Sequence, residues 1–187
     1  MARKKQYIES EVIDKAMRLF WRNGYENTSV RMLEKEMGIN QFSMYSSFKN
    51  KEGVFLESIK CYSKQIKSIT DSLEKSNNGV LGIKKYFYDF LEFTRDESMF
   101  KGCLVTNTVS EIKADSDPVI MAELKKFSSN IKNMFVRNLK QDDLREEHRI
   151  EQQADYLMNS LLGLSISSKV FNEEQLKGII EITFLNL

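Results

Sequence analysis

Apolar residues recur at steps of three and four along most of this 187-residue chain, which is the spacing of amphipathic helices. Between residues 8 and 23 this spacing lines up one apolar face, and Asn23-Gly24 marks its end because glycine readily takes a helix-ending conformation. A single proline and eight glycines leave long stretches without helix breakers. We therefore expect an all-α protein.

A compact unit of two short helices and a tight turn is predicted between residues 28 and 51. Thr28 or Ser29 can cap the first helix by accepting a backbone N–H bond, and Gly38 supplies the turn. Asn40 can cap the second helix, whose length of about eight residues gives about 12 Å at 1.5 Å per residue. The major groove of DNA is about 12 Å wide. The unit is typical of a helix–turn–helix.

Further helices are predicted along the remaining sequence. An apolar stripe from Phe55 to Leu73 predicts one long helix, and the polar run 76–79 predicts a linker after it. Asp117-Pro118 and Asn172 are typical helix starts. The helices expected beyond the linker cover residues 80–95, 103–113, 118–140, 145–170 and a final segment after 172.

The charges are divided unevenly between the two parts of the chain. Residues 1–66 hold 12 Lys or Arg against 8 Asp or Glu, a balance of +4, whereas the remainder has a balance of −3. A basic first third suggests that this part meets a polyanion. The spacing of Cys61 and Cys103 fits neither a zinc site nor a disulfide framework, and the lone His148 has no metal or catalytic partner in the pattern.

These observations argue against an enzyme and predict no cofactor and no metal. The basic start of the chain lacks the apolar core of a signal peptide, and no apolar run approaches the length of a membrane span. We therefore expect a cytoplasmic protein with no membrane partner.

The outward side of the second helix in the 28–51 unit carries groups that can read DNA. A Gln can pair with adenine through two hydrogen bonds, a Phe can contact the thymine methyl group, and Ser tolerates several bases. Tyr45 and Lys51 can reach phosphates, and Arg31 projects toward the same surface. A plain helical hairpin that does not bind DNA would have the same periodicity. In it Phe42 would lie in the core and Gln41 would be a surface residue without a binding role. The outward set is Gln41, Phe42, Ser43, Ser46 and Ser47.

The first 66 or so residues resemble the DNA-binding domain of the TetR/AcrR family of bacterial transcriptional regulators. The most specific part of the resemblance is the spacing YxxFxxKE at Tyr45–Glu52. Many relatives have a small residue at the place of Glu34 and a glycine at that of Phe42, and we expect Glu34 to face solvent. The other matching positions are Ala16, Phe20, Gly24-Tyr25, Thr28-Ser29-Val30, Leu33 and Gly38-Ile39.

This resemblance implies a division of the chain and a set of roles. Residues 1–50 would form the DNA-binding domain, with the start of a connecting helix to about residue 66, and residues 67–187 a helical effector-binding and dimerisation domain. Base reading is implied for Gln41, Phe42, Ser43 and Ser46, and for Arg31 as in some members. Phosphate positioning is implied for Thr28, Ser29, Tyr45 and Lys51. Asn40, the expected cap of the second helix, is counted with these DNA-binding residues.

The segment Phe100–Thr108 (FKGCLVTNT) is similar to a GCL(L/V)xN segment of one branch of the family, where it begins the helix under the effector pocket. Cys103 could sense oxidants or electrophiles, or be an inert buried thiol. The candidate pocket residues are Phe87, Phe90, Cys103, Asn107, Phe127 and Met134. Taken singly, such residues are more typical of an ordinary helical core. The candidate dimer residues, on the last two helices, are Leu157, Leu161, Leu164, Ile179, Ile180 and Thr183.

The function expected from these features is a homodimeric transcriptional regulator that binds operator DNA. A repressor released by a small, mainly apolar effector is the first hypothesis. An activator of the same fold is one alternative, and a helical adaptor whose helix–turn–helix does not read DNA is another. The identity of the effector, the operator sequence and the target genes are not specified by the sequence.

Overall fold

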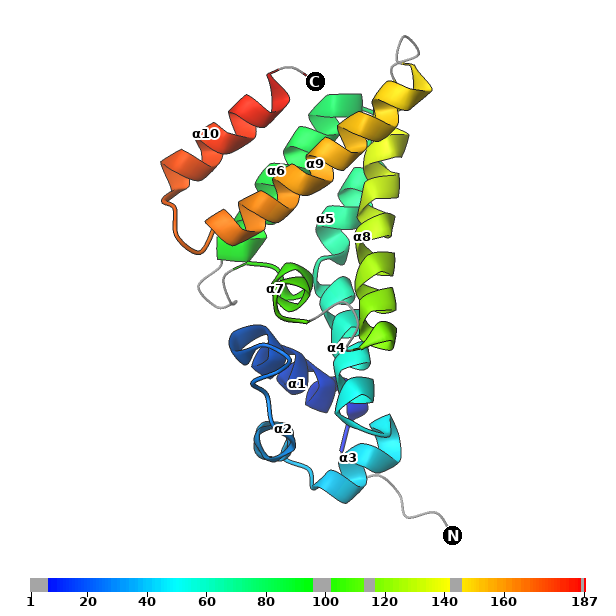
Figure 1. Ribbon diagram of the computed structural model, residues 1–187, viewed down its shortest axis with the longest axis vertical. Coiled ribbons are helices and arrows are strands. Elements are labelled where there is room, and N and C mark those ends of the chain that lie inside the picture. Colours follow the sequence, from blue (N-terminus) through cyan, green and yellow to red (C-terminus); the bar gives the residue numbers. More distant parts are fainter. Residues whose placement is uncertain (1–6, 96–101, 113–116, 142–145, 186) are drawn as a thin grey trace. The chain divides into compact units, whose positions relative to one another are not determined.

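The computed structural model describes residues 7–95, 102–112, 117–141, 146–185 and 187. This part of the chain is all-helical, as predicted, and contains ten helices and no strand (Figure 1). The helices are α1 (Glu9–Asn23), α2 (Val30–Met37), α3 (Gln41–Phe48), α4 (Lys51–Gln65), α5 (Lys67–Glu74), α6 (Gly79–Arg95), α7 (Leu104–Glu111), α8 (Pro118–Leu139), α9 (Glu147–Ser167) and α10 (Glu173–Phe184).

The contacts within the chain divide it into two compact units. The first unit comprises Met1–Gln65 and Asn107–Glu123, and the second comprises Ile66–Thr106 and Leu124–Leu187. The first unit therefore combines the N-terminal helices with a segment that lies more than forty residues further along the chain. Each unit has its own buried core and is described by itself.

Aromatic rings fill the core of the first unit, in which α1 packs against α2 and α4, and α3 packs against α4. Phe20 of α1 meets Phe55 of α4 edge-on, with ring centroids 4.9 Å apart, and Trp21 meets Tyr62 in the same way at 5.1 Å. Such pairs contribute about 0.5–1.5 kcal/mol each beyond the burial of their area. The ring packing makes α1 and α4 a firm support for α3.

The predicted helix caps of this unit are present. Ser29 Oγ accepts a hydrogen bond from the Met32 N–H at 3.2 Å, and Asn40 Oδ1 accepts one from the Ser43 N–H at 2.8 Å. Gly38 ends α2 in the left-handed conformation, with φ 70° and ψ 24°, which a side chain would strain. These local interactions fix where α2 ends and where α3 begins.

The apolar stripe over residues 55–73 forms two helices, α4 and α5, rather than the single long helix expected. The interruption lies at Ile66, whose ψ of 4° departs from helical geometry. Thr70 Oγ1 donates to the carbonyl oxygens of Ile66 at 3.3 Å and Lys67 at 3.1 Å, and such bonds compete with the backbone pattern of a helix. Ile66 and Leu73 are both buried, so the apolar periodicity continues through the break and conceals it.

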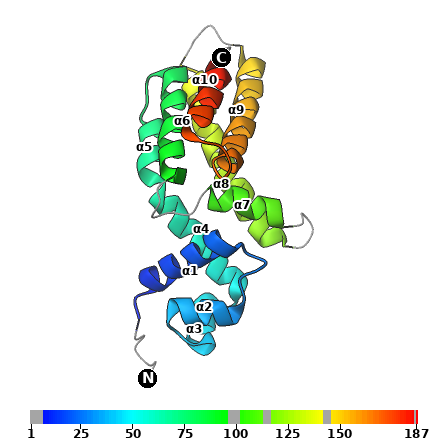
Figure 2. The ribbon, with the colours of Figure 1, turned by 90° about the vertical axis from the view of Figure 1, so that its left-hand side faces the viewer.

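The second unit is a bundle in which α6 packs against α5, α9 and α10. Both ribbon views show α10 running beside α6 and α9 (Figures 1 and 2). Phe87 of α6 is buried in the core, with its ring centroid 6.0 Å from that of Phe135 and 5.1 Å from that of Phe184. Asn172 caps α10 in a reciprocal pair of hydrogen bonds with Gln175, each 3.0 Å long.

No helix in the described ranges is long and apolar enough to cross a membrane.

Candidate nucleic-acid interface

Two glycines allow α3 to lie close to its neighbouring helices. Gly38, in its left-handed conformation, donates its N–H to the carbonyl oxygen of Glu34 at 3.0 Å and so closes α2 before the turn. At the other end, a Cβ atom on Gly53 would overlap the carbonyl oxygen of Phe48. The chain can therefore pass from α3 into α4 within a few residues, with Asn50 Oδ1 accepting the Gly53 N–H at 2.8 Å.

The exposed side of α3 brings together four of the residues expected to meet DNA. Gln41, Phe42, Tyr45 and Ser46 line one shallow depression on this helix. Phe42 is 84% exposed, which contradicts the plain hairpin with this ring in its core. The core side of α3 is formed by Met44 and Phe48, which are buried.

The polar residues at the start of α2 occupy different environments. Thr28 is fully buried, and its Oγ1 donates to the carbonyl oxygen of Gly24 at 2.6 Å. This places the Thr28 hydroxyl in the core, away from the surface that the expected phosphate contact would need. Ser29 is exposed but caps α2, and Arg31 is exposed on the outer side of the same helix.

The side chain of Lys51, the first residue of α4, lies against the ring of Tyr25 in its own chain. Its Nζ lies 4.3 Å from the centroid of the Tyr25 ring. Burial lowers the pKa of Lys51, while the nearby carboxylates of Glu26 and Glu111 act in the opposite direction. Burial, with the negative charge of Asp117 next in size, raises the pKa of Tyr25 to about 12. The expected phosphate contact of Lys51 would therefore compete with its contacts to these half-buried and exposed groups of its own chain.

The carboxylate of Glu111, at the end of α7, docks on the loop between α1 and α2. Glu111 Oε2 accepts the Glu26 N–H at 3.3 Å. A Cβ atom added to Gly24 would overlap this carboxylate, so the glycine at this position makes room for it. Segment 107–112 is thereby attached to the loop that precedes the helix–turn–helix.

Two residues that touch α3 were not among the sequence candidates. The Tyr7 hydroxyl donates to the carbonyl oxygen of Ser43 at 3.0 Å and lies 2.8 Å from Ser47 Oγ. Glu34, which is partly exposed, also accepts the Gln41 N–H with its Oε1 at 2.5 Å across the turn. Glu34 was recognisable as a departure from the family pattern, whereas nothing local to Tyr7 indicated a partner 36 residues away.

The candidate pocket residues have different surroundings. Phe87, Phe90 and Cys103 are buried in the second unit, where the Cys103 N–H donates to Ser165 Oγ at 2.9 Å. Phe127 and Met134 are partly exposed. Asn107, in the first unit, has a buried Oδ1 without a hydrogen-bond partner among the described residues.

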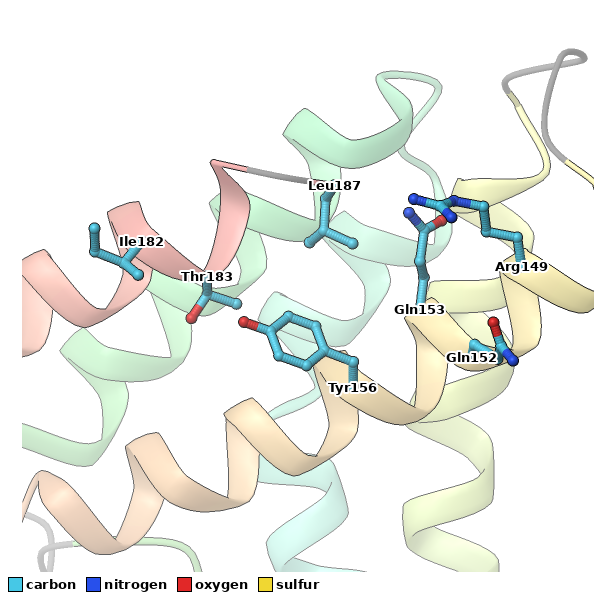
Figure 3. A pocket seen from close by; sticks show the side chains of 7 residues that line it. All are labelled: Arg149, Gln152, Gln153, Tyr156, Ile182, Thr183 and Leu187. Atoms are coloured by element: carbon cyan, nitrogen blue, oxygen red, sulfur yellow. The ribbon is translucent and has the colours of Figure 1, made fainter.

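Most of the candidate dimer residues are buried inside their own chain. Leu157, Leu161, Leu164, Ile180 and Thr183 belong to this group, and Ile179 is partly exposed. The periodicity therefore marked the inner side of α9 and α10. Next to this buried set, and sharing Thr183 with it, α9 and α10 have a surface pocket lined by Arg149, Gln152, Gln153, Tyr156, Ile182, Thr183 and Leu187 (Figure 3).

The known proteins that this chain resembles are transcriptional regulators of one class. The family model for bacterial regulatory proteins of the tetR family matches residues 12–58, which span α1 to the middle of α4. YezE of Bacillus subtilis (strain 168), an uncharacterised HTH-type transcriptional regulator, is 27% identical over 176 residues, or 91% of this chain and 90% of YezE. The HTH-type transcriptional repressor ComR of Escherichia coli (strain K12) is 24% identical over 174 residues, or 89% of this chain and 82% of ComR.

A solved structure of similar fold is that of the TetR family regulator CifR, a cysteine mutant in complex with a 26-bp operator duplex. It has a TM-score of 0.88 and 22% identity, and covers 97% of this chain and 98% of the CifR chain. The helix–turn–helix and the sequence relatives are those of a class of helix–turn–helix transcriptional regulators. Residues 12–58 thus match the tetR family of bacterial regulatory proteins, and the similarity to YezE extends over most of the chain.

Proposed function

We propose that this regulator is a dimeric repressor that binds operator DNA through α3 and leaves it when a small, mainly apolar effector binds. Residues 1–50, with the start of the connecting helix to about 66, would form the DNA-binding part, and residues 67–187 the effector-binding and dimerisation part. Such a regulator would act in the cytoplasm, where bacterial DNA lies. Repression by ComR and operator binding by CifR support the proposal.

The observation that carries DNA binding is the exposed group on α3. Gln41 and Ser46 offer hydrogen-bonding atoms next to the exposed ring of Phe42, and Tyr45 lies beside them. In helix–turn–helix proteins this helix enters the major groove and its first residues meet base edges. A polar and aromatic surface at this place fits a base-reading helix better than an adaptor surface.

An electrophoretic mobility shift tests this proposal. The duplex would be selected by the protein from a random-sequence pool, and the competitor would be a shuffled duplex of the same length. The proposal expects retardation that survives an excess of the shuffled competitor. Equal competition by both duplexes would contradict sequence-specific binding.

We propose that a second copy of the chain covers the outer side of α9 and α10. Tyr156 is 48% exposed and Ile182 is 65% exposed beside the pocket of Figure 3, so apolar surface is left uncovered there. A two-fold pair would present its two α3 helices to half-sites about 34–36 Å apart. Sedimentation should show a dimer that Ile182→Glu dissociates, whereas Leu81→Glu, at a 70% exposed site on α6, should leave it intact.

We further propose that the effector binds among apolar side chains of the second unit. Phe90 lies on α6, and Phe127 and Met134 lie on α8. Phe90 is buried, so the effector would have to displace packed side chains to enter. Release from DNA then requires that the effector bind more tightly to the conformation with low operator affinity.

A further inference from the structure

The recognition helix α3 begins on a carboxylate supplied by α2. Glu34 Oε1 accepts the N–H of Gln41, the first residue of α3, at 2.5 Å. Asn40 Oδ1 accepts the N–H of Ser43 at 2.8 Å. Two of the backbone donors that a helix leaves free at its N-terminus are therefore occupied by side chains of this chain.

This arrangement has an electrostatic consequence. The N-terminus of a helix attracts anions, and a DNA phosphate is one of the groups that can occupy it. In this protein Glu34 already brings a negative charge to the first donor. Among the described residues, no Lys or Arg forms an ion pair with Glu34. The N-terminus of α3 is thus unsuited to binding a phosphate. The side chains of its first turn are then the groups that would contact DNA, through the bases.

The same bond restricts Gln41. Its backbone N–H is held by Glu34, and its side chain is exposed in the depression that also contains Phe42 and Ser46. Because a bidentate contact to adenine demands a narrow range of positions, the orientation of the first turn of α3 affects base discrimination.

We infer that Glu34 is a positioning residue for base reading, and that its charge reduces the attraction of the protein for DNA of any sequence. The inference rests on the proposed operator binding. The two parts separate experimentally, because Glu34→Gln keeps an oxygen for the Gln41 N–H but removes the charge, whereas Glu34→Ala removes both.

The experiment measures binding of the full-length protein to a selected operator duplex and to a shuffled duplex by fluorescence anisotropy. Glu34→Gln should bind both duplexes more tightly, on the order of threefold. This is the effect of removing the repulsion between one carboxylate and one phosphate charge about 6 Å apart in water. Its preference for the operator should equal that of the wild type. Glu34→Ala should also gain affinity for the shuffled duplex, but its preference should fall about fivefold, the size of one lost helix cap.

Glu36→Gln is the matched control, because Glu36 lies on the same helix and its Oε2 is 3.8 Å from Arg22 Nη2 of α1. It removes the same charge away from α3 and should leave the operator preference unchanged. Thermal melting of each variant checks that it is folded.

Unchanged preference in Glu34→Ala would overturn the positioning role, and unchanged affinity of Glu34→Gln for the shuffled duplex would overturn the effect of its charge. A wild type with no preference would overturn operator binding itself, and the positioning role with it. If the wild type prefers the operator, and Glu34→Gln loses this preference while Glu34→Ala keeps it, the carboxylate contacts a base. That result also contradicts the inference.

Discussion

Lys51 Nζ lies 4.3 Å from the centroid of the Tyr25 ring, so the first residue of α4 is bound to the loop that precedes α2. This contact holds the N-terminus of α4 against the helix–turn–helix. A partly buried cation over an aromatic face contributes about 0.5–2 kcal/mol. The contact therefore gives Lys51 a structural role that does not depend on DNA.

Replacing Lys51 by alanine should lower the free energy of unfolding by about 0.5–2 kcal/mol, because the cation–π contact is lost. Urea denaturation without DNA measures the change. Lys64→Ala, at an exposed position of the same helix, is the control and should alter stability by less than about 0.5 kcal/mol. Equal stability of the two variants would show that Lys51 does not stabilise the fold.

Glu111 should protect the backbone amide of Glu26 from solvent exchange, because its carboxylate accepts that N–H at 3.3 Å. In Glu111→Ala the amide of Glu26 should exchange faster. Hydrogen–deuterium exchange of the free protein measures this. Val109→Ala, at a 45% exposed position of α7, should leave the exchange of this amide unchanged. Identical exchange in the Glu111 variant and the wild type would contradict the docking of α7 on this loop.

Tyr25 should make stability depend on alkaline pH. Its pKa rises from 10.0 to about 12 in the folded protein, mainly through burial and then through Asp117. The folded state therefore holds this proton more tightly than the unfolded state, and the stabilisation is complete below pH 10 and lost as pH rises through about 12. Tyr25→Phe has no hydroxyl to ionise, so urea denaturation should show a smaller loss of stability over this range. An equal loss in both proteins would contradict the shift.

Thr28 should matter for folding rather than for contact with DNA. Thr28→Val keeps the shape of the side chain but removes the buried bond to the Gly24 carbonyl oxygen. The expected cost is about 1–3 kcal/mol of unfolding free energy, because a buried acceptor loses its partner. Urea denaturation measures the cost. A Thr28→Val protein of unchanged stability and weakened DNA binding would instead favour the phosphate contact implied by the resemblance.

The features predicted correctly from sequence were those determined by neighbours along the chain. Ser29, Asn40 and Asn172 each cap a helix through a backbone N–H three residues ahead. Such interactions follow from residue type and spacing. The all-α class followed from the apolar periodicity in the same way.

The features that were missed depend on residues far apart in the sequence. Tyr7 contacts Ser43 across 36 positions, and Glu111 contacts Glu26 across 85. No local pattern encodes these pairs. Periodicity also does not distinguish burial within one chain from burial between two, which is why Leu157 was assigned to a dimer surface although it is buried within its own chain.

The central claim is that the exposed side of α3 selects the DNA sequence, and Phe42 tests it most directly. This ring is 84% exposed, so Phe42→Ala should leave the melting temperature nearly unchanged. The deciding measurement is the ratio of affinities for a selected operator duplex and a shuffled duplex of equal length at one salt concentration. We predict that the ratio falls by about fivefold or more, equivalent to at least about 1 kcal/mol of base discrimination. A folded Phe42→Ala protein with the wild-type ratio would contradict the claim.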